Sequence, residues 1–383
     1  MTDSSNKEVI LSARPGVNGT LTEKNFAVRE CDYPSDLKSG QVLIRNLYLT
    51  VDPAQRCQMN EETGVHYLLP NQVGSRVNGL GGVGEVVKCG PSDQPSDDLA
   101  TGDSRSPIKS PPKFKPGDFV MNSERLHWPW AEYFCLAEEE LALIDPEIQD
   151  LPHGLKLPLA YLGLSGLTSY LGVKSRGKVT SGDVVVVSGA AGSCGTLAGQ
   201  FALEWGAKKV IGICGSDEKC RALVDGFRFT TAVNYKSPAF ESKLAEACAD
   251  GVDVYFDNVG GEISRIVIVD HMKPAGRVVL CGQIADYNKD VPYPPPIPKD
   301  MQNAIVAKSI DRERFLVLSY QDQFPEALGD MKRMILEGKI RVEVTEAEGI
   351  EKAGWALMNM MNGGNIGKQM VKVCDSSGRV KQD

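Results

Sequence analysis

The central part of the chain alternates short, wholly apolar runs with longer amphipathic runs. Residues 184–187 are four consecutive valines, which predicts a strand buried on both faces. Residues 195–207 then repeat apolar side chains at helical spacing. The alternation continues, and further strands are expected at residues 209–215, 232–235, 251–261, 276–284 and 315–320. This order is typical of a parallel sheet whose strands are connected by crossover helices.

The segments on either side of this region predict a mainly β structure. Residues 40–52 alternate apolar and polar side chains, and residues 78–90 have the glycine density of a tightly turning strand. Residues 91–113 are rich in Pro, Ser and Asp, which predicts a solvated loop. We therefore expect an α/β chain in which a Rossmann doubly wound parallel sheet is inserted in a mainly β domain, with residues 150–321 in the first and residues 1–149 and 322–383 in the second.

Composition narrows the possible functions. The 383 residues are 42% apolar and 24% charged, as in globular proteins, and the net charge of -8 argues against a nucleic-acid partner. No window approaches 18 apolar residues, so no membrane span is expected, and the polar N-terminus lacks the apolar core that a signal peptide would have. The ten cysteines form no C-x-x-C pair, which is typical of a reduced, cytoplasmic protein.

The segment "SGAAGSCG" at residues 188–195 follows the valine strand and precedes a helix. Its glycines, Gly189, Gly192 and Gly195, have the spacing G-x-x-G-x-x-G. Glycines let a backbone approach a pyrophosphate closely, and the helix N-terminus offers unpaired N–H groups to it. A plain tight turn is the alternative, but the strand–helix context favours a dinucleotide site.

The next strand ends without the acid that usually binds the ribose hydroxyls of NAD. Cys214, Gly215 and Ser216 occupy that place. A carboxylate there would repel a 2′-phosphate, so its absence leaves room for one. Lys219 lies close by, and Tyr235 ends the third strand on the same edge. The expected cofactor is therefore NADPH, with an ordinary exposed lysine as the alternative reading of Lys219.

No grouping of Cys, His and Glu has the spacing of a zinc site, so no metal is expected. Hydride transfer to an isolated ketone would then lack a Lewis acid, whereas an enone needs only donors for the developing enolate oxygen. Tyr287, which follows the fifth predicted strand, is our candidate catalytic donor. A tyrosine packed on the neighbouring prolines is the alternative.

Several long motifs resemble those of one enzyme family. They span nearly the whole chain and include "LYLTVDPAQRCQMNEETG", "VVSGAAGSCGTLAGQ", "GVDVYFDNVGG", "LCGQIADYNKDVPYPPP" and "GGNIGKQ". The set resembles the zinc-independent medium-chain dehydrogenase/reductases, and within them the prostaglandin reductases. This resemblance implies a GroES-like outer domain, NADPH as cofactor, and a conjugated-enone substrate. It further implies a 15-keto prostaglandin reduced at its 13,14 double bond, as by a 15-oxoprostaglandin 13-reductase.

The resemblance also implies which residues form the site. NADPH would be bound by Gly192, Ser193, Cys194, Gly195, Lys219, Tyr235, Asn258, Cys281, Gly282, Gln283, Ile284, Ala285, Asp286, Tyr287, Phe315, Leu316, Val317 and Asn365. The substrate wall would contain Tyr67, Leu126 and His127, and "PYPPP" after Tyr287 would act as a mobile lid. The chain departs from the family at Ala54, Gln55, Leu126 and His127, which alters the expected wall, and in the longer loop at residues 91–113.

We therefore expect an NADPH-dependent 2-alkenone reductase, a monomer or homodimer, whose partner is a small lipid enone. Two alternatives stay open, a quinone or ketone reductase of the same fold and a non-enzymatic nucleotide-binding protein. A lipid keto-acid would also need a cation for its carboxylate. Arg56 is a candidate, and a surface ion pair is the other interpretation of that residue.

Overall fold

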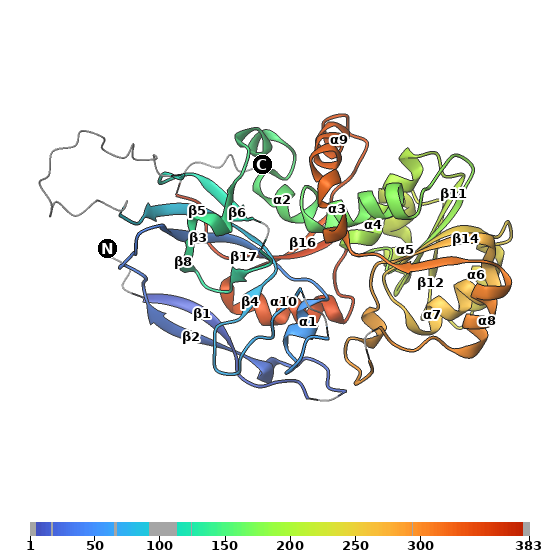
Figure 1. The fold of residues 1–383 in the computed structure, drawn as a ribbon, viewed down its shortest axis with the longest axis horizontal. Helices are drawn as coiled ribbons and strands as arrows, with labels where there is room; N and C mark the ends of the chain where they lie inside the picture. Colours follow the sequence, from blue (N-terminus) through green and yellow to red (C-terminus); the bar gives the residue numbers. More distant parts are fainter. Residues whose placement is uncertain are drawn as a thin grey trace, which may run out of the picture.

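The computed structural model describes residues 5–16, 18–64, 67–91, 113–123, 125–292 and 294–377. Apart from its two end residues, the loop predicted at residues 91–113 lies outside these ranges, as does Tyr293 of the predicted lid. The chain forms two lobes, one mainly β and one with a sheet between helices (Figure 1). No helix in the described ranges has the length and apolar character that a membrane crossing requires.

The second lobe is built on a six-stranded, all-parallel sheet of order β12-β11-β10-β13-β14-β15. Its strands are β10 (Val184–Ser188), β11 (Lys209–Cys214), β12 (Thr231–Asn234), β13 (Val252–Asp257), β14 (Met272–Leu280) and β15 (Asp311–Arg314). The order reverses between β10 and β13, and ligands of such sheets bind outside the carboxyl ends of the strands at this switch point.

The four valines of β10 are all buried and serve both faces of the sheet. Val185 and Val187 belong to one core, with α3 (Leu164–Leu171), α4 (Ser193–Glu204), α5 (Asp217–Phe227) and α9 (Phe324–Leu336). Val184 and Val186 belong to the core on the other face, with α6 (Phe240–Ala247), α7 (Gly261–Ile266) and α8 (Lys299–Ala307). The alternation follows from the two-residue period of a strand.

The mainly β lobe is a seven-stranded sheet of order β16-β17-β3-β5-β6-β9, with β8 also paired to β3. Its strands are β3 (Gln41–Thr50), β5 (Gly82–Cys89), β6 (Phe119–Asn122), β8 (Tyr133–Ala137), β9 (Leu141–Leu143), β16 (Val344–Glu348) and β17 (Lys368–Lys372). Two smaller pairs, β1 (Ser5–Leu11) with β2 (Phe26–Asp32) and β4 (Asn78–Gly79) with β7 (Trp128–Pro129), and helices α1 (Gln55–Gln58), α2 (Leu157–Ala160) and α10 (Ala353–Met361) complete the strands and α-helices of the described residues. The predicted fold class is confirmed, and the domain limits stay a prediction.

One predicted strand is wrong. Residues 315–320 were expected to form the sixth strand, but β15 is the polar segment Asp311–Arg314 just before them. Residues 317–323 form 3-10 turns instead. An edge strand pairs on one side only and needs no apolar run, so β15 escapes the hydrophobic pattern. The apolar side chains of Phe315 and Val317 are buried in the core beside the sheet.

Candidate active site

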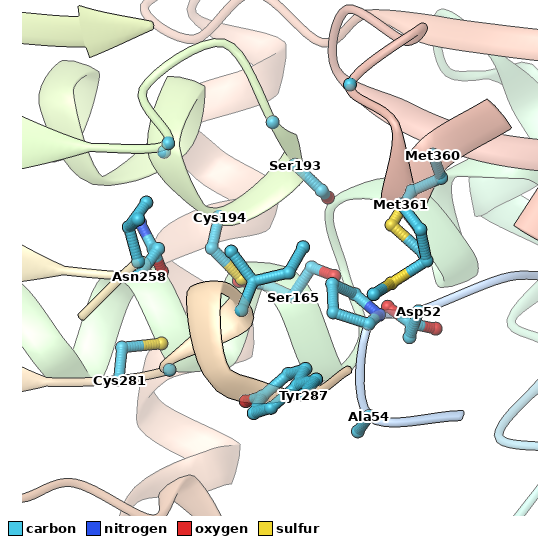
Figure 2. A pocket seen from close by; sticks show the side chains of 18 of the residues that line it. Asp52, Ala54, Ser165, Ser193, Cys194, Asn258, Cys281, Tyr287, Met360 and Met361 are labelled. Carbon is cyan, nitrogen blue, oxygen red and sulfur yellow. The ribbon is translucent and has the colours of Figure 1, made fainter. Parts of the chain in front are cut away.

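A cavity of about 770 Å³ lies where the two lobes meet. Every strand of the parallel sheet contributes to its lining with a residue at or just after its carboxyl end: Gly189, Cys214, Tyr235, Asn258, Cys281 and Phe315. The β lobe supplies the opposite wall, which includes Asp52, Ala54, Asn365 and Lys368. Figure 2 shows Ser193, Cys194, Asn258 and Tyr287 around this space, with Asp52 and Ala54 approaching from the β lobe.

The glycine turn forms one side of the cavity. Gly189 adopts a φ of +58°, which favours glycine, and Gly192 is the N-cap residue of α4. A Cβ at Gly195 would lie only 2.4 Å from the carbonyl oxygen of Gly189, so the third glycine lets the helix start close to the strand. The hydroxyl of Ser193 is buried with no partner in the described protein. An unused donor beside a helix N-terminus fits a pyrophosphate group.

Lys219 and Tyr235 also line this cavity. Ser216 caps α5 by accepting from the backbone N–H of Lys219, which fixes the start of that helix. The Lys219 ammonium forms no ion pair within the described ranges, and burial lowers its pKa. Gly363 of the β lobe faces it, because a Cβ there would lie 3.8 Å from Lys219 Nζ. A half-buried cation without a carboxylate partner fits a bound phosphate.

Asn258 is held in place by Ser188, whose hydroxyl donates to the buried carboxylate of Asp257. Asp257 is fully buried and accepts from the Ser188 hydroxyl (3.0 Å) and from the backbone N–H groups of Val259 and Gly260 (both 3.0 Å). Asn258 donates from its backbone N–H to the Ser188 hydroxyl and from Nδ2 to the Ser188 carbonyl. These bonds fix the turn after β13 at the switch point, with Asn258 in the cavity lining.

Tyr287 follows a single 3-10 turn, Ile284–Asp286, after β14. Its hydroxyl oxygen accepts from the backbone N–H of Gln283 at 3.4 Å. It also lies over Gly282, where a Cβ would be 3.4 Å from the phenol oxygen. The loop itself is tied to the sheet, because the N–H of Ala285 donates to the Val259 carbonyl at 3.0 Å. The sequence-predicted donor is therefore part of the cavity wall.

Most of the predicted site residues are brought together in this cavity. The lining contains Gly192, Ser193, Cys194, Gly195, Lys219, Tyr235, Asn258, Cys281, Gly282, Ile284, Ala285, Tyr287, Phe315, Leu316, Val317 and Asn365, together with Tyr67 and Leu126 from the predicted substrate wall. Gln283, Asp286 and His127 are outside the lining. Asp286 forms an ion pair with Lys289. Nδ1 of His127 lies 3.6 Å from Oε1 of Glu140, and burial lowers the pKa of His127.

Asp52 and Lys368 are a charged pair in the lining that the sequence analysis did not single out. Lys368, which is 3% exposed, forms an ion pair with Asp52 and donates to the Ser165 hydroxyl at 3.3 Å. Asp52 also accepts from the Thr50 hydroxyl at 2.9 Å. Both residues belong to motifs quoted for the resemblance, "VDP" and "GGNIGKQ". Asp52 lies two residues after β3 and Lys368 is the first residue of β17, so a charged residue at the end of a strand was the available signal.

The C-terminal glycine-rich segment contacts the glycine turn directly. The N–H of Gly367 donates to the Ala191 carbonyl at 2.9 Å, and Gly192 and Gly367 form an isolated parallel bridge. Within this turn, Nδ2 of Asn365 donates to the Gly367 carbonyl at 2.8 Å.

No group of three His, Cys, Asp or Glu side chains among the described residues could hold a metal ion.

Comparison with known proteins agrees with this architecture. A family model for zinc-binding dehydrogenases matches residues 194–333, and one for the N-terminal domain of oxidoreductases matches residues 7–105. Prostaglandin reductase 1 of Bos taurus is 34% identical over 92% of this chain and 95% of its own length. The NADP(+)-dependent 2-alkenal reductase of Nicotiana tabacum is 33% identical over 96% and 98%.

A solved structure shows the same fold over nearly all of the chain. CurA from Vibrio vulnificus, in complex with NADPH, aligns with a TM-score of 0.81 and 27% identity over 97% of this chain and all of that one. The curated relatives exceed 30% identity over almost their full lengths, which is enough to establish the family. The chain therefore belongs to the medium-chain dehydrogenase/reductase family, in its zinc-independent, quinone-oxidoreductase-type branch.

Proposed function

We propose that this protein is an NADPH-dependent reductase of the conjugated C=C bond of enones. One observation carries the proposal: a single cavity is lined by a dinucleotide-type glycine turn, by Lys219, which forms no ion pair among the described residues, and by Tyr287. The CurA structure was solved with NADPH, and the tobacco relative is named for the reduction of 2-alkenals. An active reductase also accounts for the intact pocket better than a non-enzymatic nucleotide-binding protein does.

The cofactor is NADPH, which supplies the hydride when bound. Its pyrophosphate would be held by the backbone of Gly192 and Gly195 and by the unpartnered Ser193 hydroxyl. Lys219 and Tyr235 would take the 2′-phosphate, where an acid of an NAD-binding protein would repel it. Asn258 and Asn365 also line the cavity, and we propose that they contact the ribose hydroxyls.

Tyr287 stabilises the substrate charge. When hydride reaches the β-carbon of an enone, electron density moves to the carbonyl oxygen, which becomes an enolate. The Tyr287 hydroxyl donates a hydrogen bond to that oxygen, while the N–H of Gln283 donates to the phenol oxygen and strengthens its acidity. One such donor is typically worth about 3 kcal/mol of transition-state stabilisation. The α-carbon then takes a proton from Tyr287 or from water.

The substrate class we propose is a lipid enone such as a 15-keto prostaglandin, reduced at its 13,14 double bond. The similarity to prostaglandin reductase 1 supports it, as does a cavity of about 770 Å³, which lies in the size range of sites for small organic ligands. The wall toward the substrate contains Ala54, Tyr67, Leu80 and Leu126.

Oxidation of NADPH, followed at 340 nm, tests this function. We expect turnover with a 15-keto prostaglandin and a short 2-alkenone, and much less with the saturated ketone of the same length. Tyr287→Phe should lower kcat while Tyr33→Phe, in a ring pair with Tyr133 in the β lobe, serves as the matched control. Turnover of quinones with neither enone reduced would instead establish the rival quinone reductase.

A further inference from the structure

Arg56 is a buried cation that holds three parts of the molecule together. It belongs to α1 and is 1% exposed. Its Nε donates to Oδ1 of Asn288 at 2.8 Å, Nη1 to Oδ1 of Asn60 at 2.7 Å, and Nη2 to the Gly19 carbonyl at 2.8 Å. Neither role considered from the sequence fits, because Arg56 does not line the cavity and forms no surface ion pair in the described ranges.

All three acceptors of Arg56 are neutral. Burial lowers the pKa of Arg56, but a guanidinium stays charged throughout the range in which proteins are stable. Burying a charged group costs desolvation free energy, and the three hydrogen bonds of Arg56 offset that cost. The planar fork reaches three acceptors in different directions at once, which a lysine ammonium on a single flexible stem does not reproduce.

One of these acceptors is next to the proposed catalytic tyrosine. Asn288 follows Tyr287 directly in the loop after β14. On the sheet side, the N–H of Ala285 donates to the Val259 carbonyl at 3.0 Å. On the side of the β lobe, Arg56 holds Asn288, and the N–H of Asp290 donates to Oδ1 of Asn18 at 2.9 Å. Tyr287 therefore lies between an anchor on each lobe.

We propose that Arg56 is a positioning residue for Tyr287, acting through Asn288 to hold the loop of residues 283–290 against the β lobe. This inference rests on the proposed function, in which the Tyr287 hydroxyl donates to the enolate oxygen. Without Arg56 the bond from Asp290 to Asn18 remains, but Asn288, the neighbour of Tyr287, is released, which lets the hydroxyl leave the place where the enolate oxygen forms. The glycine turn and the start of α5 at Lys219 are held by bonds outside this loop, so we expect the phosphate contacts, and with them most of the NADPH affinity, to persist without it.

The test uses Arg56→Lys and Asn288→Ala in the full chain, with Arg333→Lys on the exposed face of α9 as the matched control. Both test variants should lower kcat for a 2-alkenone at least tenfold and leave the Kd for NADPH within twofold of wild type. In the Tyr287→Phe background the same changes should lower kcat by less than a further twofold, because no hydroxyl remains to be positioned. A full tenfold loss in that background would overturn the proposal.

Hydrogen–deuterium exchange of the unliganded protein separates this inference from the proposed function. Peptides covering residues 283–290 should exchange faster in Arg56→Lys and Asn288→Ala and unchanged in Arg333→Lys. Unchanged exchange in both test variants would overturn the positioning role even if enones are reduced. Faster exchange would support the anchor even if the wild-type protein reduced no enone. If Arg56→Lys does not fold, Asn288→Ala, which removes one acceptor only, decides both measurements.

Discussion

Replacing Gly195 with alanine tests the glycine turn most directly. A Cβ at Gly195 would lie 2.4 Å from the Gly189 carbonyl oxygen and 2.6 Å from Cα of Ala190, both backbone atoms. Ordinary carbon contacts begin near 3.4 Å, so the turn and the start of α4 must separate by about 1 Å. Overpacking of this kind typically costs about 1–3 kcal/mol of unfolding free energy. The displaced N–H groups should also weaken NADPH binding by about tenfold or more.

Gly192→Ala is the matched control for this change. Gly192 has φ −82° and ψ 176°, which alanine adopts readily, and the nearest atom to its Cβ would be 3.3 Å away. We expect Gly192→Ala to keep nearly wild-type stability in denaturant unfolding and still to lose NADPH affinity in calorimetry, because its methyl group enters the cavity. Gly195→Ala should lose both. Wild-type stability and affinity in Gly195→Ala, or wild-type affinity in Gly192→Ala, would refute the reasoning.

Other residues of the site give further predictions. Tyr287→Phe should reduce kcat by about 10²–10³-fold with NADPH affinity within twofold, measured by steady-state kinetics and fluorescence titration, and an unchanged kcat removes the donor role. Lys219→Gln should weaken NADPH by about 10–100-fold and leave NADH unaffected, whereas equal losses for both cofactors would contradict a 2′-phosphate contact. Because burial lowers the pKa of Lys219, its ammonium loses its proton at a lower pH than an ordinary lysine, so NADPH affinity should fall as pH rises toward that pKa. Lys219→Arg should remove the decline in a calorimetric pH series, and a decline that persists would place its origin elsewhere. Ser188→Ala removes the hydroxyl that bonds both Asp257 and Asn258, and it should lower the free energy of unfolding by about 1–3 kcal/mol, measured by denaturant unfolding. An unchanged free energy of unfolding would show that these bonds do not stabilise the turn.

The parallel sheet could be predicted because its information is local. Four buried valines, a glycine turn and an amphipathic helix follow one another within about two dozen residues, and the structure contains the parallel sheet that this pattern indicates. The exception is β15, where the strand is the polar segment Asp311–Arg314 and the apolar residues beside it pack into the core. An edge strand carries no hydrophobic signal of its own, so a pattern search selects its neighbour.

The site was predictable only in part, because only residues that are neighbours in the sequence leave a pattern in it. The glycine turn, Lys219 and Tyr287 are found from what lies next to them in the sequence. Lys368 and Asp52 are 316 residues apart, and Arg56 and Asn288 are 232 apart, so neither pairing leaves a local trace. The sequence also does not reveal which charged side chains are buried. A surface ion pair was one interpretation of Arg56, but its side chain is one of the most buried in the fold.

The cavity depends on chain segments that are distant in sequence and meet at the seam between the lobes. The Gly367–Ala191 hydrogen bond seats the C-terminal turn on the phosphate side, and Gly363 covers Lys219. On the opposite side Arg56 ties the Tyr287 loop to the β lobe. The chain after β15 returns to the β lobe, so the second chain segment of that lobe also supplies the cofactor wall. In the proposed function, cofactor selectivity and the position of the donor depend on separate contacts across one seam, so changes at Lys219 and Arg56 should affect affinity and kcat independently.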